Sequence, residues 1–304
     1  MLTEAQSLRP LLDADEISIL PGATDPWTAR LIERVGFRGV YMTGAGLANA
    51  MLGVPDIGLT TLTEMATQAG RIAQSVDVPV LADADTGFGG VANVARTVRE
   101  YERAGVAALH LEDQVSPKRC GHFDGTTVVP VEEMLLRLHA ALEARTDPNF
   151  AVIARTDARA SEGLDAAIER GRAYAAAGID GLFVEALKTV DEFAAVGAAF
   201  PDLPLIANMV EGGKSPLIPA AELQQLGFRL VIYANLPLRL SAAAVLSGLE
   251  HLRAHGSSAE LLDRVLPWAE RQAIVGIDDY HAVEARLLAL VDETLARVRP
   301  PASE

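Results

Sequence analysis

Residues 78–113 read VPVLADADTGFGGVANVARTVREYERAGVAALHLED, and this stretch decides the fold. It holds two short apolar runs, 78–85 and 107–113, and each run ends in acidic residues. The segment between the runs has a helical pattern and ends in Ala104-Gly105, where glycine favours the end of a helix. A strand, a helix and a second strand of this kind predict one βαβ unit with buried, parallel strands.

The same alternation of short apolar runs and amphipathic segments extends along the chain. The other runs are ISIL near Ile17 and those that end at Gly44, Asp157, Ala186, Met209 and Asn235. Eight such runs favour a closed (β/α)8 barrel of the TIM type, with a doubly wound open sheet as the alternative. Local signals agree, since Thr61 and Glu64 are spaced as a capping box and the helix predicted over 164–177 ends at Gly178.

The residues after about 258 exceed what eight strand–helix units need. They carry an apolar stripe at helical spacing, formed by Val283, Leu287, Leu290, Val291 and Leu295. The stripe could cover the bottom of the barrel or pack on another subunit. We predict a single domain over 1–304 with a C-terminal helical extension, about 258–304, that is used in oligomerisation.

Composition limits the partners and the compartment. The chain has 26 basic and 41 acidic residues, a formal charge of −15, and such a surface repels nucleic acid and anionic membranes. Its single cysteine, Cys120, cannot form an internal disulfide. The N-terminus lacks the pattern of a signal peptide, and no apolar run approaches the roughly 20 residues of a membrane span. We therefore expect a cytoplasmic protein.

Polar residues follow the predicted strands at the end where barrel enzymes place their active sites. They are Tyr41, Thr43, Gly44, Ala45, Asp83, Asp85, Glu112, Asp113, Arg155, Asp157, Glu185, Asn208 and Glu211. Any one of them could be a helix cap or a satisfied buried carboxylate, but their convergence from several strands indicates an active site. The backbone N–H groups of residues 43–46 suit a carboxylate or a phosphate.

Two aspartates suggest a metal site. Asp83 and Asp85 are two residues apart on one strand, so both point to the same face, and Glu112 adds a third carboxylate. All-oxygen ligands suit Mg²⁺, for which Mn²⁺ could substitute, whereas pairing of the carboxylates with arginine is the structural alternative. The six histidines are scattered and show no spacing for zinc, and His110 is expected in the core.

The loop after the fourth strand contains the cysteine. Lys118, Arg119 and His122 flank Cys120, and neighbouring cations lower the pKa of a thiol and make it a usable acid or nucleophile. An incidental surface cysteine is the alternative. The glycines of the loop Val210-Glu211-Gly212-Gly213-Lys214 indicate a mobile or tightly turned loop, with an ordinary turn as the alternative.

Four motifs together resemble the isocitrate lyase/phosphoenolpyruvate mutase superfamily over about residues 21–288. They are ADADTGFGG (82–90), LEDQVSPKRCGH (111–122), ARTDA (154–158) and NMVEGGKSPL (208–217). KRCGH is typical of the carbon–carbon lyase branch, whose members act on 2-methylisocitrate and 2,3-dimethylmalate. The family fold is a barrel that exchanges its eighth helix between subunits, usually in a homotetramer that is a dimer of dimers.

The resemblance also implies roles for individual residues. Asp83 and Asp85 would hold Mg²⁺, with Glu112 in the outer network, and Cys120 would protonate the departing carbanion. Thr43, Gly44 and Ala45 would bind the carboxylate of the 2-oxo acid through backbone donors. Arg155, Glu185 and Asn208 would position substrate carboxylates with the assistance of Arg239, and Asp56, Gly121 and His122 would also belong to the substrate site. Tyr41 and Asp56 would lie near the acid–base groups.

The implied activity is Mg²⁺-dependent cleavage of a malate-type 2-hydroxy acid to a 2-oxo acid, such as pyruvate, and a carboxylate. The substrate would be a small dicarboxylate or tricarboxylate, and Val210, which cannot hydrogen-bond, favours a dicarboxylate such as an alkylmalate. Carboxyphosphonoenolpyruvate phosphonomutase and oxaloacetate hydrolase or decarboxylase chemistry are the alternatives within the superfamily. A Schiff-base aldolase would need a lysine on a strand, and Lys118, Lys188 and Lys214 all follow strand ends. A non-catalytic sensor barrel is a further alternative, which the set of Asp83, Asp85 and Cys120 disfavours.

Overall fold

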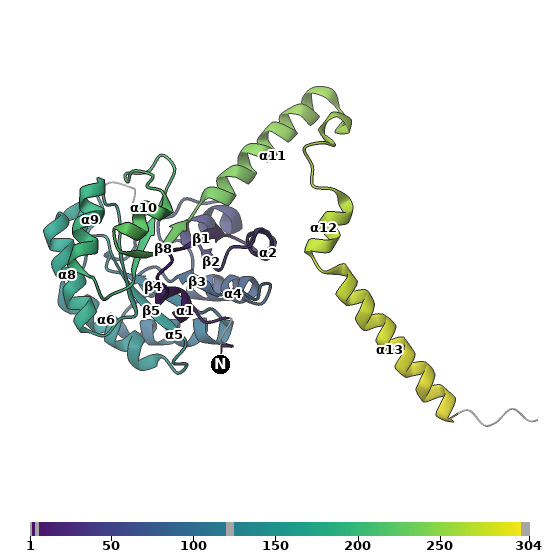
Figure 1. Cartoon of the computed structure of the whole chain (residues 1–304), viewed down its shortest axis with the longest axis horizontal. Helices are drawn as coiled ribbons and strands as arrows, with labels where there is room; N and C mark the ends of the chain where they lie inside the picture. The colour runs from purple at the N-terminus through teal and green to yellow at the C-terminus, as the bar shows by residue number, and fades with distance from the viewer. Residues whose placement is uncertain (1, 4–5, 120–124, 299–304) are drawn as a thin grey trace, which may run out of the picture. The chain divides into compact units, whose positions relative to one another are not determined.

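The computed structural model describes residues 2–3, 6–119 and 125–298 and contains a closed barrel of parallel strands (Figure 1). The strands are β1 (Ser18–Ala23), β2 (Val40–Met42), β3 (Val80–Asp83), β4 (Ala108–Glu112), β5 (Ala151–Thr156), β6 (Gly181–Val184), β7 (Leu205–Asn208) and β8 (Phe228–Tyr233). Each strand pairs with the next, and β8 pairs in parallel with β1. The predicted (β/α)8 barrel is therefore confirmed, and the open sheet is excluded.

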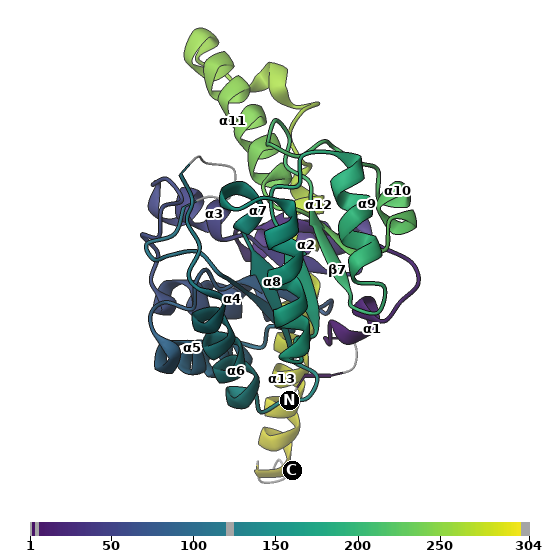
Figure 2. The same ribbon diagram turned by 90° about the vertical axis from the view of Figure 1, so that its left-hand side faces the viewer.

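Helices cover the outside of the strands (Figures 1 and 2). Those in the first part of the chain are α1 (Arg9–Leu12), α2 (Pro26–Val35), α3 (Gly44–Leu47), the π-helical segment η1 (Ala48–Leu52), α4 (Leu62–Ala73), α5 (Val91–Ala104), α6 (Val131–Ala144), α7 (Ala158–Ser161), α8 (Leu164–Ala176), α9 (Val190–Ala199) and α10 (Ala220–Gln225). After β8 come α11 (Leu236–His255), the 3₁₀ turn η2 (Ala259–Leu261), α12 (Trp268–Ile274) and α13 (Ile277–Val298).

The predicted helix signals are present at the ends of these helices. Thr61 accepts a hydrogen bond from the Glu64 backbone N–H, and the Glu64 carboxylate accepts one from the Thr61 N–H, so the capping box is complete. Gly105 and Gly178 adopt positive φ angles of 86° and 88° just after α5 and α8. These residues end each helix in the left-handed conformation, which costs glycine little and turns the chain toward the next strand.

Successive side chains of each strand point to opposite sides of the barrel wall and so belong to two different apolar cores. Side chains such as Leu81, Ile153 and Phe183 pack with one another inside the barrel. Their neighbours Ala82 and Val152 belong to the larger core between the strands and the helices. Because side chains alternate across a strand, the polar residues that continue the inward series at the strand ends must also face the interior.

One close contact of the helix layer gives a stability prediction. Gly197 of α9 lies so near the backbone that an added Cβ would be 1.8 Å from the Leu226 carbonyl oxygen, whereas a Cβ at Gly70 of α4 would meet no atom closer than 3.5 Å. Gly197→Ala should therefore destabilise the protein by about 3 kcal/mol or more, at the upper end of overpacking costs. Gly70→Ala, the matched helix variant, should be neutral or stabilising by up to about 1 kcal/mol. Equal urea unfolding midpoints for the two variants would contradict this packing.

The chain divides into two compact units, Met1–Val245 and Leu246–Glu304. In contrast to α4–α9, neither α11 nor α13 has a buried residue. The predicted stripe lies on α13, where each of its five side chains is more than 40% exposed. Exchange of a helix between subunits and a role of this extension in oligomerisation stay predictions. Within the described residues, no helix combines the length and apolar character needed to cross a membrane.

Candidate active site

The inward-facing residues at the carboxyl ends of the strands meet in one acidic cluster. A small cavity of about 40 Å³ lies there. Its lining consists of Tyr41, Thr43, Ala45, Asp56, Asp83, Lys118, Arg119, Arg155, Glu185, Asn208, Val210, Ala234 and Asn235. Most of the substrate-binding residues expected from the sequence are thus brought together, with Lys118 and Arg119 in addition.

Asp83 and Asp85 stay close to one another although β3 ends between them. Asp85 adopts a φ of 46°, and its backbone N–H donates to Asp83 Oδ1 at 2.9 Å. Gly44 lies directly against Asp83, because a Cβ at this glycine would be 2.5 Å from Asp83 Oδ2. A side chain at position 44 would therefore displace the aspartate. As first residues of α3, Gly44 and Ala45 carry N–H groups that the helix itself cannot satisfy.

Lys118 lies in the wall of the cavity, a position that the sequence analysis did not predict. Its Nζ lies 2.7 Å from Asp85 Oδ1 and 2.5 Å from Asp56 Oδ1, and its side chain is only 5% exposed. Burial would lower the pKa of Lys118, but the surrounding carboxylates raise it well above its ordinary value, so the amine stays charged. Its place two residues before the cysteine was the available signal, since KRCGH follows a strand end.

Arg155 is the second buried cation of the site. It binds Asp157 through two hydrogen bonds of 2.9 Å and lies 3.4 Å from Glu112 and 3.3 Å from Glu185. Its guanidinium also lies over the Phe183 ring, 5.1 Å from the centroid. This shared pairing fixes the plane of the guanidinium, so Arg155 can present N–H groups to a substrate carboxylate in a defined orientation.

Tyr41 and His110 form a buried pair beside Asp83. Tyr41 Oη lies 2.9 Å from His110 Nε2 and 3.5 Å from Asp83 Oδ2, and both side chains are almost fully buried. Burial, followed by the charge of Asp83, raises the pKa of Tyr41 well above its ordinary value. Burial lowers the pKa of His110 to about 4. The phenol therefore keeps its proton at neutral pH and His110 is a neutral core histidine, as expected.

The charges of the site fit a divalent cation. Six carboxylates, those of Asp56, Asp83, Asp85, Glu112, Asp157 and Glu185, lie around two cations among the described residues, Lys118 and Arg155. Burial first, and then the charge of Asp83, raises the pKa of Asp85 to about 6 despite Lys118. Burial also raises the pKa of Glu112, whose Oε1 has no hydrogen-bond partner among the described residues. A cation would relieve this repulsion.

The structural alternative, in which the carboxylates pair with arginine, holds for some of the six carboxylates. Arg155 pairs with Glu112, Asp157 and Glu185, whereas Asp83 has no arginine partner within salt-bridge distance among the described residues. Burial would raise the pKa of Asp83, but His110 in its protonated form, Lys118 and Arg155 lower it to about 2. Mg²⁺ usually binds one or two carboxylates and completes its shell with water and substrate oxygens, so two carboxylates such as those of Asp83 and Asp85 would suffice for such an ion.

Several residues expected at the site lie elsewhere. Asp113 points away from the barrel interior, because it follows the inward-facing Glu112, and it accepts hydrogen bonds from Thr156 Oγ1 at 2.7 Å and Tyr174 Oη at 2.9 Å. Arg239 is absent from the cavity lining and instead donates to the Glu211 carbonyl oxygen. Cys120, Gly121 and His122 lie outside the described residues.

The expectation that no histidines have zinc-ligand spacing was wrong. His251 and His255 are four residues apart on α11, one helical turn, and Glu260 lies beside them. Their ligand atoms all lie within 4.8 Å of one another, and among the described residues no other such group of three was found. This cluster belongs to the second compact unit and shares no residue with the acidic site of the barrel.

A parallel barrel with polar and charged residues gathered at the carboxyl ends of its strands defines a TIM-barrel enzyme site. Residues 8–253 match the phosphoenolpyruvate phosphomutase family, and the chain belongs to this family, within the PEP mutase/isocitrate lyase superfamily. The protein is therefore an enzyme.

Relatives of known name support this assignment. The chain is 43% identical to 2,3-dimethylmalate lyase of Eubacterium barkeri over 93% of this chain and 98% of the relative. It is 48% identical to the probable 2-methylisocitrate lyase 1 of Corynebacterium glutamicum over 93% and 92% of the two chains.

Solved structures of the superfamily have the same fold. Oxaloacetate acetylhydrolase with the inhibitor 3,3-difluorooxalacetate has a TM-score of 0.88 and 40% identity, over 93% of this chain and 96% of that one. Phosphonopyruvate hydrolase with oxalate and Mg²⁺ has a TM-score of 0.85 and 33% identity, over 94% and 100%.

Proposed function

We propose that this enzyme is a Mg²⁺-dependent carbon–carbon lyase that cleaves an alkylmalate to a 2-oxo acid and a second carboxylate. The observation that carries the proposal is the buried set of Asp83, Asp85 and Lys118 in a chain that is 43% and 48% identical to two lyases. An excess of buried carboxylates suits a metal and a dianionic substrate that the metal helps to neutralise. We place this enzyme in the cytoplasm.

The metal would be held by Asp83 and Asp85, with Glu112 near it. When bound, Mg²⁺ supplies Lewis-acid polarisation of the substrate oxygens, for which Mn²⁺ could substitute. Gly44 and Ala45 bind the 2-carboxylate through backbone N–H groups at the start of α3, beside the N-cap residue Thr43, whose own N–H donates to the Ala23 carbonyl oxygen. Arg155 and Asn208 orient the other carboxylate, and Asn208 is itself held by a 3.1 Å hydrogen bond to Glu185 Oε2.

The reaction needs a base that removes the proton of the 2-hydroxyl group and an acid that gives a proton to C3. Glu112 Oε1, which has no hydrogen-bond partner among the described residues, accepts the proton of the 2-hydroxyl group. The C2–C3 bond then breaks, and C2 becomes the carbonyl carbon of the 2-oxo acid. The electron pair of the broken bond stays with C3, which becomes part of an enediolate. Tyr41 and Arg155 donate hydrogen bonds to the developing charges. Cys120 protonates C3 and releases the second carboxylate.

Val210 limits the substrate to two carboxylates. It lines the cavity beside Asn208, and its isopropyl group cannot donate a hydrogen bond. A third carboxylate placed against it would lose water without gaining a partner, at a cost of a few kcal/mol. An alkylmalate therefore fits this wall better than 2-methylisocitrate does.

The substrate assignment is tested by comparing three compounds under identical conditions with Mg²⁺. Pyruvate release from 2,3-dimethylmalate should have the highest kcat/KM, with 2-methylisocitrate lower and oxaloacetate cleavage absent. Oxaloacetate hydrolysis as the main activity would instead support the second candidate, which the 40% identity to oxaloacetate acetylhydrolase favours. Phosphonomutase activity would be detected by ³¹P NMR with a phosphonate substrate.

The proposed enzyme is a homotetramer in which α13 packs on a neighbouring subunit. The stripe of five apolar side chains on α13 is the basis, because so many exposed leucines and valines on one helix indicate a contact surface. Light scattering should give the mass of a tetramer, and Leu287→Asp with Leu290→Asp should reduce it to a smaller species. A wild-type monomer at micromolar concentration would contradict the proposed assembly.

A further inference from the structure

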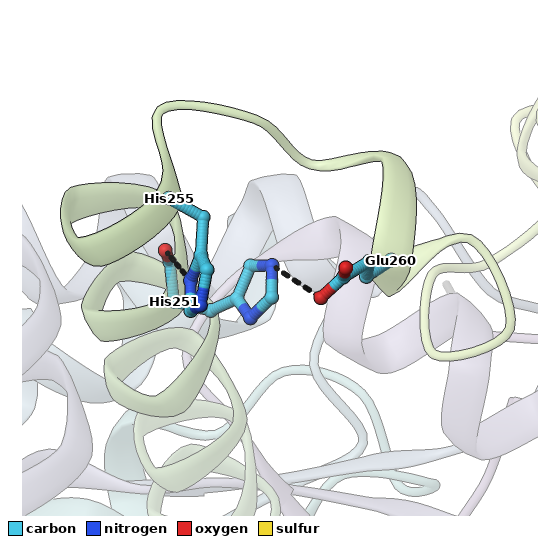
Figure 3. Close-up of side chains that lie close together, drawn as sticks. All are labelled: His251, His255 and Glu260. Atoms are coloured by element: carbon cyan, nitrogen blue, oxygen red, sulfur yellow. Dashed lines mark hydrogen bonds and ion pairs between the residues drawn. The ribbon is translucent and has the colours of Figure 1, made fainter.

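We propose that His251, His255 and Glu260 form a binding site for a divalent transition-metal ion such as Zn²⁺, separate from the Mg²⁺ site of the barrel. Figure 3 shows the three side chains, with both histidines on the last turns of α11 and Glu260 on η2. His251 Nε2 lies 3.7 Å from Glu260 Oε2, and all three ligand atoms lie within 4.8 Å of one another.

The spacing of the ligands suits a zinc ion. Two histidines one turn apart on a helix place their rings on the same face, which is the arrangement of helical zinc motifs. The His251 and His255 rings are nearly parallel, with centroids 4.2 Å apart and 22° between their planes. Tetrahedral Zn²⁺ with bonds of about 2.0–2.1 Å needs ligand atoms about 3.3 Å apart. Small side-chain rotations reach this distance, because His255 and Glu260 are exposed.

One ring is already oriented as a metal ligand. His255 Nδ1 lies 3.0 Å from the His251 carbonyl oxygen. A carbonyl oxygen can only accept a hydrogen bond, so Nδ1 carries the proton and Nε2 keeps a lone pair. A backbone carbonyl in this position fixes the tautomer and the ring plane of metal-binding histidines in many sites.

The chemistry of the three ligands selects the metal. Imidazole nitrogens suit Zn²⁺, Ni²⁺ and Cu²⁺, whereas Mg²⁺ prefers oxygen ligands. The negative end of the α11 dipole lies beside the site and favours a cation. Arg253 is two residues from His251, which places it on a different side of the helix. Three protein ligands leave a fourth position for water, so the ion would bridge α11 to η2 across Gly256, whose φ is 66°.

The test is isothermal titration of the full chain with Zn²⁺ in the presence of excess Mg²⁺. The Cys120→Ser background removes the single thiol, and Mg²⁺ occupies the carboxylates of the barrel. We expect one Zn²⁺ per chain. When His255→Gln is combined with Cys120→Ser, Zn²⁺ binding should weaken by more than about 10–100-fold, since that loss already follows from removing a residue that only hydrogen-bonds to a metal ligand. His139→Gln, which replaces an exposed histidine of α6, is the matched control and should bind as the background does.

Two outcomes would overturn the site. One is the absence of Zn²⁺ binding in the Cys120→Ser background. The other is binding that survives unchanged in a His251→Gln, His255→Gln variant, since the ion would then lie elsewhere. Co²⁺ gives an independent readout, because a tetrahedral site with nitrogen ligands produces intense visible absorption that His255→Gln should abolish. Far-UV circular dichroism of each variant verifies that the substitutions leave the fold intact.

Discussion

An Asp85→Asn variant should have on the order of 10³-fold lower activity than the wild-type enzyme, and EDTA should abolish wild-type activity until Mg²⁺ or Mn²⁺ is restored. Lewis-acid stabilisation by a metal is worth several kcal/mol in the transition state, and each 1.36 kcal/mol corresponds to about tenfold in rate. Burial, followed by the charge of Asp83, raises the pKa of Asp85, and among the described residues Lys118 is its opposing charge, at 2.7 Å. Asp15→Asn, which removes a fully exposed carboxylate, should leave activity unchanged.

Thermal unfolding separates loss of metal from loss of fold. The pKa of Asp85 is raised to about 6 in the folded protein, above its ordinary value of 3.8. The folded state therefore resists ionisation of this group, and its contribution to stability falls as the pH rises from about 4 to 6. At neutral pH, metal-free Asp85→Asn should unfold at or above the wild-type temperature. Mg²⁺ at 100 times its Kd should stabilise wild type by about 2.7 kcal/mol and the variant much less.

Full activity of metal-free wild-type protein would contradict the proposed mechanism. Inactivity of Asp85→Asn together with an unchanged stabilisation by Mg²⁺ would place the metal elsewhere. The two measurements thus distinguish a metal ligand from a residue that serves only to hold Lys118.

The strands could be predicted because each is a short apolar run followed by polar residues. A buried parallel strand needs apolar side chains on both faces, and the barrel leaves few other places for such runs. The first strand was found least accurately, since ISIL at 17–20 covers only part of β1, Ser18–Ala23. Its second half, Pro-Gly-Ala, has little strand propensity and is held by pairing with β2 and β8.

The alternation of side chains explains both the successes and one error at the site. Asp83 and Arg155 were correctly predicted to face the site, because each lies two positions after a residue that points into the barrel, Leu81 and Ile153 respectively. By the same rule Glu112 and Asp113, which are adjacent, cannot both face the interior. Asp113 could thus have been excluded from the sequence alone, whereas its contact with Tyr174 on α8 depends on tertiary packing.

The position of Lys118 could not be predicted from strand patterns. It lies in a loop six residues after β4, and no periodicity describes how a loop returns to the barrel. Only the structure shows its amine between Asp56 and Asp85. The histidine pair of α11 was missed for a different reason, because the spacing of four was visible in HLRAH but Glu260 becomes its neighbour only through the turn.

A Cys120→Ser variant should turn over substrate at least about 10²-fold more slowly than wild type, with little change in substrate or Mg²⁺ affinity. The serine hydroxyl has nearly the same size and polarity as the thiol but is a much weaker acid, and loss of a proton donor typically costs about 10²–10⁴-fold. Lys118 and Arg119, the two preceding residues, line the cavity and remain in the variant. The charges that bind the ground state are therefore preserved.

The single cysteine makes a second measurement unambiguous. An alkylating reagent can modify only one thiol, so mass spectrometry of the intact chain reports on Cys120 directly. If the thiol faces the bound substrate, 2,3-dimethylmalate with Mg²⁺ should slow alkylation, whereas Mg²⁺ alone should slow it less. The thermal midpoint of Cys120→Ser should stay within a few degrees of wild type, because the substitution exchanges a single sulfur atom for oxygen. Near-normal turnover in this variant would remove the general-acid role and, with it, the main residue-level reason to favour a lyase over a mutase, because a mutase transfers a group without protonating a released carbanion.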